Sequence, residues 1–522
     1  MNRPWNRRDF LRTTAGVTAG LLSGCAAGPV GIRRLISRPK LPHGVQCGDV
    51  SSQGAVLWTA ADREAKLWFE IATDPSFKNA RRVPGPEVDV RSAFTGRVFV
   101  RNLPDDATVY YRAIATPIDE PSAESEPIVG EFRTPPALGT TPRDVRFVWS
   151  GDTAGQGWGI DLARGGMTTY RTMAEADPDF FIHCGDTIYA DGPLTETIAL
   201  DDGTVWRNVM TEAKSKVAET VEDFRGNHRY NLLDEHVRAF NARVPQLVQW
   251  DDHETVNNWY PGEILPASDR RYRVREVDVL AQRARQAFGE WTPVRSFDDD
   301  PNRIYRRAAY GDALEVFLLD MRSYRGPNTD NLEARDVPFL GAKQFSWLTD
   351  ALTSSKATWK IIASDMPLGL VVRDGDTAFE NLSNADPGKP RGRERELARL
   401  LRNLRRAKVR NVVWLTADVH YTAAHHYSPE RAAFTDFDPF WEFVSGPLHA
   451  GNFGPNELDA TFGPEVKFQK APPPGQGNLP PSAGLQFFGE GVVAASDRSL
   501  TVRLRDVAGS TLYSQTIPAA RP

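Results

Sequence analysis

RFVWSGD, residues 146–152, is a short apolar run that ends on an acidic residue. The same pattern returns in FFIHCGD (180–186), LVQWDDHE (247–254), LEVFLLD (314–320), WKIIASD (359–365) and VVWLTADVH (412–420). Short apolar runs of this kind are typical of buried strands. Because ligand sites in open α/β sheets gather beyond the carboxyl ends of strands, we expect these acids to share one cleft. Carboxylates in one cleft repel each other unless cations lie between them, so the pattern predicts a metal site.

Strand-like runs alternate with helical segments from residue 144 to residue 522, which predicts an α/β layered catalytic domain. The helical pattern is clearest in RGGMTTYRTMAEA (164–176), LDEHVRAFNARV (233–244), VLAQRARQAFGEW (279–291) and GRERELARLLRNLRRA (392–407). The last runs, within residues 489–517, predict strands that close one side of a sheet. The polar segment 191–229 is expected to be an insertion, partly helical and able to cap the cleft.

Residues 41–135 alternate strand and turn without a helical period, which predicts an all-β sandwich as the N-terminal domain. Within it, LPDDATVYYRA (103–113) resembles the late-strand signature of fibronectin type III modules. The Pro-rich stretch TPPALGTTPR (134–143) is expected to be a stiff linker to the catalytic domain.

Length, net charge and cysteine content limit the possible classes of protein. A length of 522 residues favours two domains, and a net charge of −5 gives no general electrostatic reason to bind nucleic acid. We therefore expect no nucleic-acid-binding surface. Three cysteines are too few for an iron–sulfur cluster and indicate no disulfide framework.

Residues 1–40 are predicted to be a targeting signal and tether rather than part of a domain. Residues 6–12, NRRDFLR, resemble the twin-arginine signal of folded exported proteins, and a mildly apolar stretch follows. Residues 22–25, LSGC, resemble a bacterial lipobox, which would make Cys25 a lipid anchor; a plain small-residue cleavage region is the alternative. Both alternatives imply export by the twin-arginine machinery to the periplasm or cell envelope.

Six motifs occur in one order and carry a family resemblance: SGDTAGQ (150–156), HCGDTIYADGP (183–193), QWDDHETVNNW (249–259), LLDMRSYRG (318–326), TADVHY (416–421) and VSGPLHAGNFGPNELD (444–459). Together they resemble the PhoD-type alkaline phosphatases and phosphodiesterases of the calcineurin-like metallophosphoesterase superfamily. HGVQCGDVSSQGAVLWT (43–59) is similar to the opening of that family's N-terminal domain. The resemblance implies a two-sheet sandwich flanked by helices and a binuclear centre, with Fe³⁺ at the first site and Ca²⁺ at the second.

The resemblance assigns six metal ligands: Asp152, Asp186, Tyr189, Asp252, Asp418 and His420. Asp186 is expected to bridge the two cations, because Gly185 before it allows close backbone approach. A trivalent cation would bind Tyr189 as a phenolate, although packing in the core is the alternative for this ring. Asp418 and His420 are two residues apart on a segment that is expected to be extended, so their side chains should point to the same side and bind adjacent metals.

One departure from the family concerns Asp152, because relatives commonly place a Cys ligand there, and this makes the metal identity uncertain. Asp252 is expected to replace the Asn ligand of the superfamily's GNH motif. A literal GNH at 226–228 is the alternative, but it follows a helix-like segment. Asp251 is expected to orient a neighbouring ligand. Asp365 is either a further ligand of the second metal, where the superfamily uses a His, or a turn residue before Met366 and Pro367.

Two residues are predicted to be catalytic. His253 would bind a phosphate oxygen or protonate the leaving alkoxide. Arg322 offers a planar fork that matches phosphate oxygens, but a structural ion pair with a nearby Asp is the alternative.

The predicted function is hydrolysis of a phosphate ester by a metal-activated hydroxide. The motifs leave open a phosphodiesterase or phospholipase D-like activity, because both substrate types place the same phosphorus between the same metals. A catalytically inactive envelope binding protein is the alternative of another class. A redox enzyme is disfavoured, because its Cys-rich or dinucleotide-loop signatures are missing from the sequence.

Overall fold

The computed structural model describes residues 38–52 and 54–520. The predicted twin-arginine signal and Cys25 lie outside the described residues. No helix among those described is long and apolar enough to cross a bilayer.

The larger of the two main sheets has nine strands, and three of the predicted acid-ended strands lie side by side in it. Its order is β24 (Thr511–Ile517), β23 (Leu500–Asp506), β22 (Phe487–Val493), β8 (Val145–Ser150), β9 (Phe180–Cys184), β12 (Gln246–Gln249), β1 (Val45–Ser51), β2 (Gly54–Ala60) and β5 (Thr95–Arg101). Strands β8, β9 and β12 are parallel, so their carboxyl ends meet at one edge. Strands β22 to β24 extend the sheet as antiparallel strands, as the C-terminal pattern predicts.

The second main sheet has seven strands and carries the other three acid-ended runs. Its order is β13 (Arg306–Tyr310), β14 (Leu314–Leu318), β15 (Trp359–Ala363), β18 (Val412–Thr416), β20 (Phe440–Val444), β19 (Thr422–Tyr427) and β21 (Pro464–Lys470). Strands β14, β15, β18 and β20 are parallel. Their carboxyl ends therefore share an edge as well.

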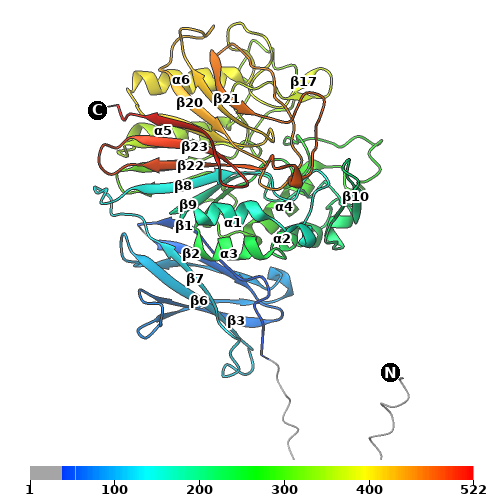
Figure 1. Cartoon of the computed structure of the whole chain (residues 1–522), viewed down its shortest axis with the longest axis vertical. Helices are drawn as coiled ribbons and strands as arrows, with labels where there is room; N and C mark the ends of the chain where they lie inside the picture. Colours follow the sequence, from blue (N-terminus) through cyan, green and yellow to red (C-terminus); the bar gives the residue numbers. More distant parts are fainter. Residues whose placement is uncertain (1–37, 53, 521–522) are drawn as a thin grey trace, which may run out of the picture. The chain divides into compact units, whose positions relative to one another are not determined.

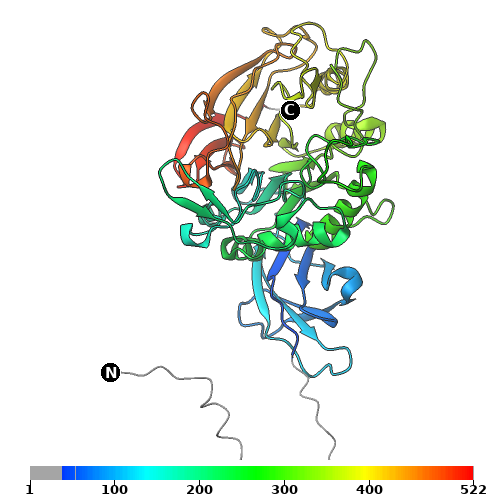
Figure 2. The same cartoon turned by 90° about the vertical axis from the view of Figure 1, so that its right-hand side faces the viewer.

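The two sheets pack face to face on a buried core that includes Phe147 and Trp149 from the first sheet and Val316, Ile361 and Leu415 from the second. Helices α1 (Thr168–Glu175) and α3 (Glu235–Arg243) cover the outer face of the nine-stranded sheet. Helices α5 (Gly341–Ser354) and α6 (Glu394–Arg406) cover the outer face of the seven-stranded sheet. The predicted mixed α/β architecture is confirmed, and its layers are visible in Figures 1 and 2.

The N-terminal part is built from strands, as predicted. A four-stranded antiparallel sheet has the order β4 (Arg81–Val88), β3 (Ala65–Ala72), β6 (Thr108–Thr116) and β7 (Ile128–Arg133). It shares an apolar core with β1, β2 and β5. Strand β1 also pairs in parallel with β12, so the N-terminal strands continue the larger sheet. The fibronectin-like topology and a domain boundary at residue 135 stay predictions.

Four of the six longer helices match segments that the sequence predicts as helical, and α2 (Val221–Asn231) lies mostly in the segment 191–229, which was expected to be partly helical; α5 was not predicted. The fourth predicted helix is α4 (Val277–Trp291). The segment 191–229 contains most of α2 and a short hairpin of β10 (Thr197–Ala199) and β11 (Val205–Arg207). A second short pair is formed by β16 (Arg373–Asp374) and β17 (Ala378–Phe379).

Truncation of a leucine between the two main sheets should destabilise the protein far more than truncation of a surface leucine. Leu314 in β14 is 0% exposed in the inter-sheet core, whereas Leu162 is 69% exposed. We expect Leu314→Ala to cost about 2–5 kcal/mol of unfolding free energy through the cavity that it leaves. Leu162→Ala should stay within about 0.5 kcal/mol. Urea unfolding followed by tryptophan fluorescence measures both, and equal midpoints would contradict this packing.

Candidate metal centre

The candidate site is formed by the loops that follow the parallel strands of both sheets. Gly185 after β9 has φ +100°, and a Cβ there would lie 2.5 Å from the Cβ of Asp251. Only glycine therefore allows the loops after β9 and β12 to approach so closely. Asp152 and Asp186 also have positive φ values, +67° and +51°, so tight turns rather than continued strands present these carboxylates.

Two groups of potential ligands share Asp186. Asp152, Asp186 and His420 each bring one oxygen or nitrogen atom within 4.8 Å of the others. Asp186, Asp252 and His253 form a second group with the same spacing. A carboxylate has two oxygens, so Asp186 can serve both groups at once.

Four carboxylate oxygens at this edge have no hydrogen-bond partner among the described residues. They are Oδ2 of Asp152, Oδ2 of Asp251, Oδ1 of Asp252 and Oδ2 of Asp365. Their residues are only 1–2% exposed. Because a buried carboxylate oxygen without a donor is costly, this set of oxygens fits one or more cations. The donor set, oxygens with a few imidazole nitrogens, suits hard or borderline metal ions.

The pKa values at this edge reflect the crowding of buried acids. Burial raises the pKa of Asp152 to about 8 and that of Asp186 well above its usual range. For Asp252, burial also opposes ionisation, but the nearby His253 and Arg322 outweigh it and lower the pKa to about 2. The protein alone thus stabilises only part of the negative charge that these residues can carry.

Tyr189, a predicted ligand, lies beside His420 of the first group. It is buried, and its hydroxyl lies 2.8 Å from Nε2 of His420. The other ring nitrogen of His420, Nδ1, is hydrogen-bonded to the carbonyl of Gly451 and orients the ring. Nε2 of His420 is also 3.7 Å from Oδ1 of Asp152. Phenol, imidazole and carboxylate thus converge at one point.

Asp418 differs from the prediction in its local geometry. Strand β18 ends at Thr416, and both Asp418 (φ +67°) and His420 (φ +60°) have left-handed backbones, with a tight turn in which the amide of Val419 donates to the carbonyl of Ala417. The expected extended segment is therefore wrong. Asp418 belongs to neither group of three ligands found among the described residues. Burial raises the pKa of Asp418 well above its usual range, and the charges of Glu380, Asp252 and Asp152 add to this effect, so Asp418 lies close to the other acids.

Asp191 orients the imidazole ring of His253. Nδ1 of His253 is 2.7 Å from Oδ1 of Asp191, which leaves only Nε2 for another partner. Its ring also packs on Tyr189, with 4.3 Å between the ring centroids. Burial opposes protonation, but Asp191 and Asp252 outweigh it and raise the pKa of His253 well above its usual value. His253 is thus placed both as a potential ligand and as a potential proton donor.

Arg322 is 0% exposed and surrounded by carboxylates. Its Nε donates to Oδ1 of Asp251 at 2.6 Å, and its Nη2 donates to Glu380. Nη2 is also 3.8 Å from Oδ2 of Asp252. The geometry favours the structural ion pair over the catalytic role predicted for Arg322, because only Nη1 lacks a partner among the described residues.

Several acids and one cation near the site escaped the sequence prediction. Glu254 accepts from the backbone amide and hydroxyl of Thr187 at 2.5 and 2.6 Å, and it also accepts from the amide of Asp251. Lys214 is buried and donates to the carbonyl of Tyr189 at 3.1 Å. Glu254 and Asp191 lie inside quoted motifs, which was a usable signal. Lys214 and Glu380 lie outside the motifs, and nothing local identifies them.

The remaining histidines and cysteines mostly have structural partners. His183 hydrogen-bonds Thr153, and Cys47 and Cys184 are free and buried. The literal GNH at 226–228 lies inside α2, away from the strand ends, so WDDHE is the motif that reaches the site. Nε2 of His449 donates to the carbonyl oxygen of Gly159 at 2.9 Å, and His449 belongs to neither ligand group.

Comparison with known proteins identifies relatives over nearly the whole chain. The family model of PhoD-like phosphatases matches residues 147–504, and that of the PhoD-like phosphatase N-terminal domain matches residues 25–136. Alkaline phosphatase D of Bacillus subtilis (strain 168) is 28% identical over 486 residues, which covers 87% of this chain and 78% of that protein.

Solved structures support the fold. A structure of PhoD aligns with a TM-score of 0.71 at 22% identity, over 93% of this chain and 91% of that chain. Purple acid phosphatase PPD1 from yellow lupin (Lupinus luteus) seeds aligns with a TM-score of 0.56 at 12% identity, over 92% of this chain and 74% of that chain.

Removal of the Arg322 charge should destabilise the protein. Arg322→Met leaves Asp251 and Glu380 buried without their cation, so we expect a loss of about 3–5 kcal/mol of unfolding free energy. The matched variant Arg243→Met breaks an exposed pair with Glu131, 3.1 Å long, and should cost about 0–1 kcal/mol. Chemical denaturation measures both. Unchanged stability together with a large loss of kcat/KM in Arg322→Met would instead assign Arg322 to substrate binding.

Proposed function

Because the chain belongs to the PhoD-like phosphatase family and is a phosphoric ester hydrolase, we propose that it hydrolyses its substrate at a binuclear metal centre built around Asp186. The observation that carries this proposal is the sharing of Asp186 between two groups of ligands. The buried carboxylate oxygens without partners support it independently.

The two proposed metal positions use different residues. Asp152, Asp186, Tyr189 and His420 would hold the first cation. Asp186 and Asp252 of the second group would hold the second cation together with Asp418, which lies outside both groups of three, while His253, the third member of that group, would face the substrate. When bound, two cations would supply Lewis acidity and generate hydroxide from water near neutral pH, so that no serine nucleophile is required.

Fe³⁺ at the first position and Ca²⁺ at the second are the metals that the family resemblance implies. The phenol of Tyr189 supports a trivalent first cation, because a high charge density is needed to bind a phenolate at neutral pH. The three carboxylates proposed for the second position, Asp186, Asp252 and Asp418, support Ca²⁺. Asp152 in place of the family's cysteine makes the first position harder, in the sense of preferring oxygen, than in relatives with a thiolate.

His253 is proposed to act on the substrate rather than on a metal. Asp191 fixes its tautomer and orientation through Nδ1, so Nε2 can donate a proton. That proton would go either to a phosphate oxygen as a hydrogen bond or to the leaving alkoxide. The elevated pKa of His253 agrees with a proton donor.

The proposed substrate is a phosphate monoester, in line with the name of the Bacillus subtilis relative. A diester substrate places its phosphorus in the same position, so a rate comparison of an aryl phosphate with a bis-aryl phosphate separates the two. We further propose that the protein acts in the periplasm or cell envelope after twin-arginine export, either free or anchored through Cys25. The resemblance of residues 6–12 and 22–25 to export signals supports this location.

Replacement of the shared carboxylate should remove both metals. We expect about two cations per wild-type chain by elemental analysis of protein purified without chelators, one of them iron and one calcium. Asp186→Asn should lose most of both and lower kcat/KM by more than about a hundredfold, because metal and hydroxide are lost together. The control Asp350→Asn, at an exposed position of α5, should keep both metals and full activity. A full complement of zinc, or normal activity in Asp186→Asn, would refute the proposal.

Loss of the proposed proton donor should depend on the leaving group. In His253→Asn, hydrolysis of an alkyl phosphate should slow by about 10²–10⁴-fold, since its poor leaving group needs the proton. Hydrolysis of 4-nitrophenyl phosphate should slow much less, because nitrophenolate leaves without help. The control His236→Asn should change neither rate. An equal loss on both substrates would show that His253 does not protonate the leaving group.

A further inference from the structure

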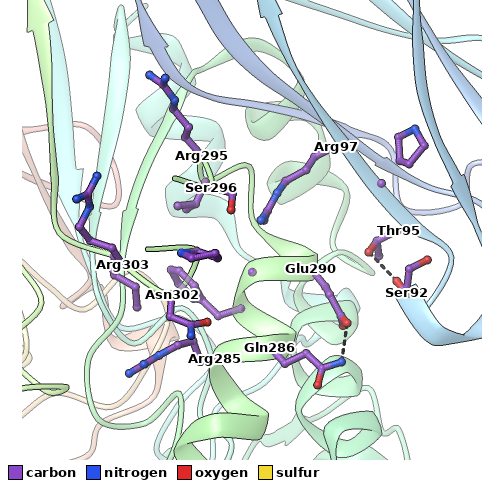
Figure 3. Close-up of a pocket in the computed structure, with 17 residues that line it drawn as sticks. Ser92, Thr95, Arg97, Arg285, Gln286, Glu290, Arg295, Ser296, Asn302 and Arg303 are labelled. Atoms are coloured by element: carbon purple, nitrogen blue, oxygen red, sulfur yellow. Dashed lines mark hydrogen bonds between the residues drawn. The ribbon is translucent and has the colours of Figure 1, made fainter. Parts of the chain in front are cut away.

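A cavity of about 410 Å³ lies between strand β5, helix α4 and the loop of residues 294–304 (Figure 3). Four arginines line it: Arg97, Arg285, Arg295 and Arg303. None of the six metal ligands proposed above lines this cavity. It is therefore a basic hollow distinct from the candidate metal centre.

Arg97 is the cation that faces this cavity. Figure 3 shows its side chain crossing from β5 toward helix α4, with the guanidinium end inside the hollow. Its Nη1 is buried and has no hydrogen-bond partner, and no carboxylate of the described residues forms an ion pair with Arg97. Burial lowers the pKa of Arg97, although Asp49 and Glu290 oppose this. A half-buried guanidinium that has no ion-pair partner is stabilised by an added anion.

The acids near the cavity are already engaged. Glu290 lines the cavity, but both of its carboxylate oxygens accept from Arg225, each at 2.7 Å. Asp49 is paired with Arg306 at 2.8 Å. Asp299 pairs with Arg303 at 2.9 Å, but Asp299 is largely exposed, so this pair reduces the positive charge of the cavity only weakly. Arg97 thus keeps a positive charge without an ion-pair partner among the described residues, and the concave wall concentrates its field.

We propose that this cavity binds an oxyanion, the phosphate group of a small molecule, outside the catalytic centre. The planar guanidinium of Arg97 matches two phosphate oxygens at once. Ser296 and Asn302 line the same cavity and offer further donors. The volume lies in the range of small-molecule pockets, about 300–1,000 Å³, so it accommodates inorganic phosphate or a phosphorylated organic molecule.

Arg285 links the cavity to the candidate metal centre. Its guanidinium lies 4.7 Å from the ring centroid of Trp250 and donates to the hydroxyl of Ser323 at 2.6 Å. Asp320 accepts from both Ser323 and the indole of Trp250, at 2.6 and 2.9 Å. Trp250 directly precedes Asp251 and Asp252 in the chain. A substitution of Arg285 would therefore disturb both sites, and the test uses Arg97 and Asn302 instead.

The test counts phosphate sites on the full-length, metal-loaded protein by equilibrium dialysis with labelled inorganic phosphate. Arg97→Gln removes the facing charge. Asn302→Asp adds a carboxylate of nearly the same shape at an exposed position of the cavity wall, so it leaves the fold intact. Arg243→Gln, at an exposed arginine outside the cavity, is the control. Asp186→Asn removes the catalytic phosphate site.

We expect two phosphate sites in the wild type and in Arg243→Gln, and one in Asp186→Asn. Arg97→Gln should lose the cavity site, and Asn302→Asp should weaken it by at least about tenfold, since like charges then face the ligand. Both should keep the wild-type kcat on an aryl phosphate. Two results would overturn the proposal. One is an absence of phosphate binding in Asp186→Asn, and the other is phosphate binding in Asp186→Asn that does not change when Arg97→Gln is added. This result is independent of the catalytic proposal, which rests on metal content and turnover.

A second arm identifies the source of the phosphate group. Phenylphosphonate carries a similar oxyanion on an organic group. Its phosphorus is bonded to carbon rather than to an ester oxygen, so phosphate-ester hydrolysis does not cleave it. Tighter binding of phenylphosphonate than of phosphate to Asp186→Asn identifies a phosphorylated organic molecule as the ligand class. Tighter binding of phosphate identifies the free anion. Binding of neither probe overturns the proposal.

Discussion

Mutual repulsion of buried carboxylates is the constraint on which the rest of this structure depends. Parallel strands of two packed sheets end at the same place, and each delivers an acid to an interior where water cannot screen the charge. Asp186 lies where the two groups of ligands meet. Such an arrangement is stable only if protons, a buried cation or bound metal ions compensate the charge.

The chain itself compensates part of this charge through one buried arginine. Arg322 neutralises the side formed by Asp251 and Glu380. On the other side, Asp152 and Asp252 keep oxygens without partners. One part of the acidic cluster is therefore an internal ion-pair network, while the part around Asp186 keeps the free carboxylate oxygens that the proposed metal centre requires.

The sequence predicted most of this arrangement because the information is local. A run of apolar residues that ends on Gly-Asp predicts both the strand and the position of its acid, as for Asp186. The extended segment expected at Asp418 was wrong, because a turn at positive φ depends on neighbours that are distant in sequence. Glu380 could not be predicted for the same reason: its role comes from tertiary contacts, not from a local pattern.

The account's central claim is that two cations share the carboxylate of Asp186. Anomalous diffraction from crystals of active protein, collected at the iron edge and at a longer wavelength for calcium, locates both metals directly. The account predicts two anomalous peaks about 4 Å apart with an oxygen of Asp186 bound to each. A single peak beside Asp186 in fully active protein, or two peaks at other residues, would contradict it.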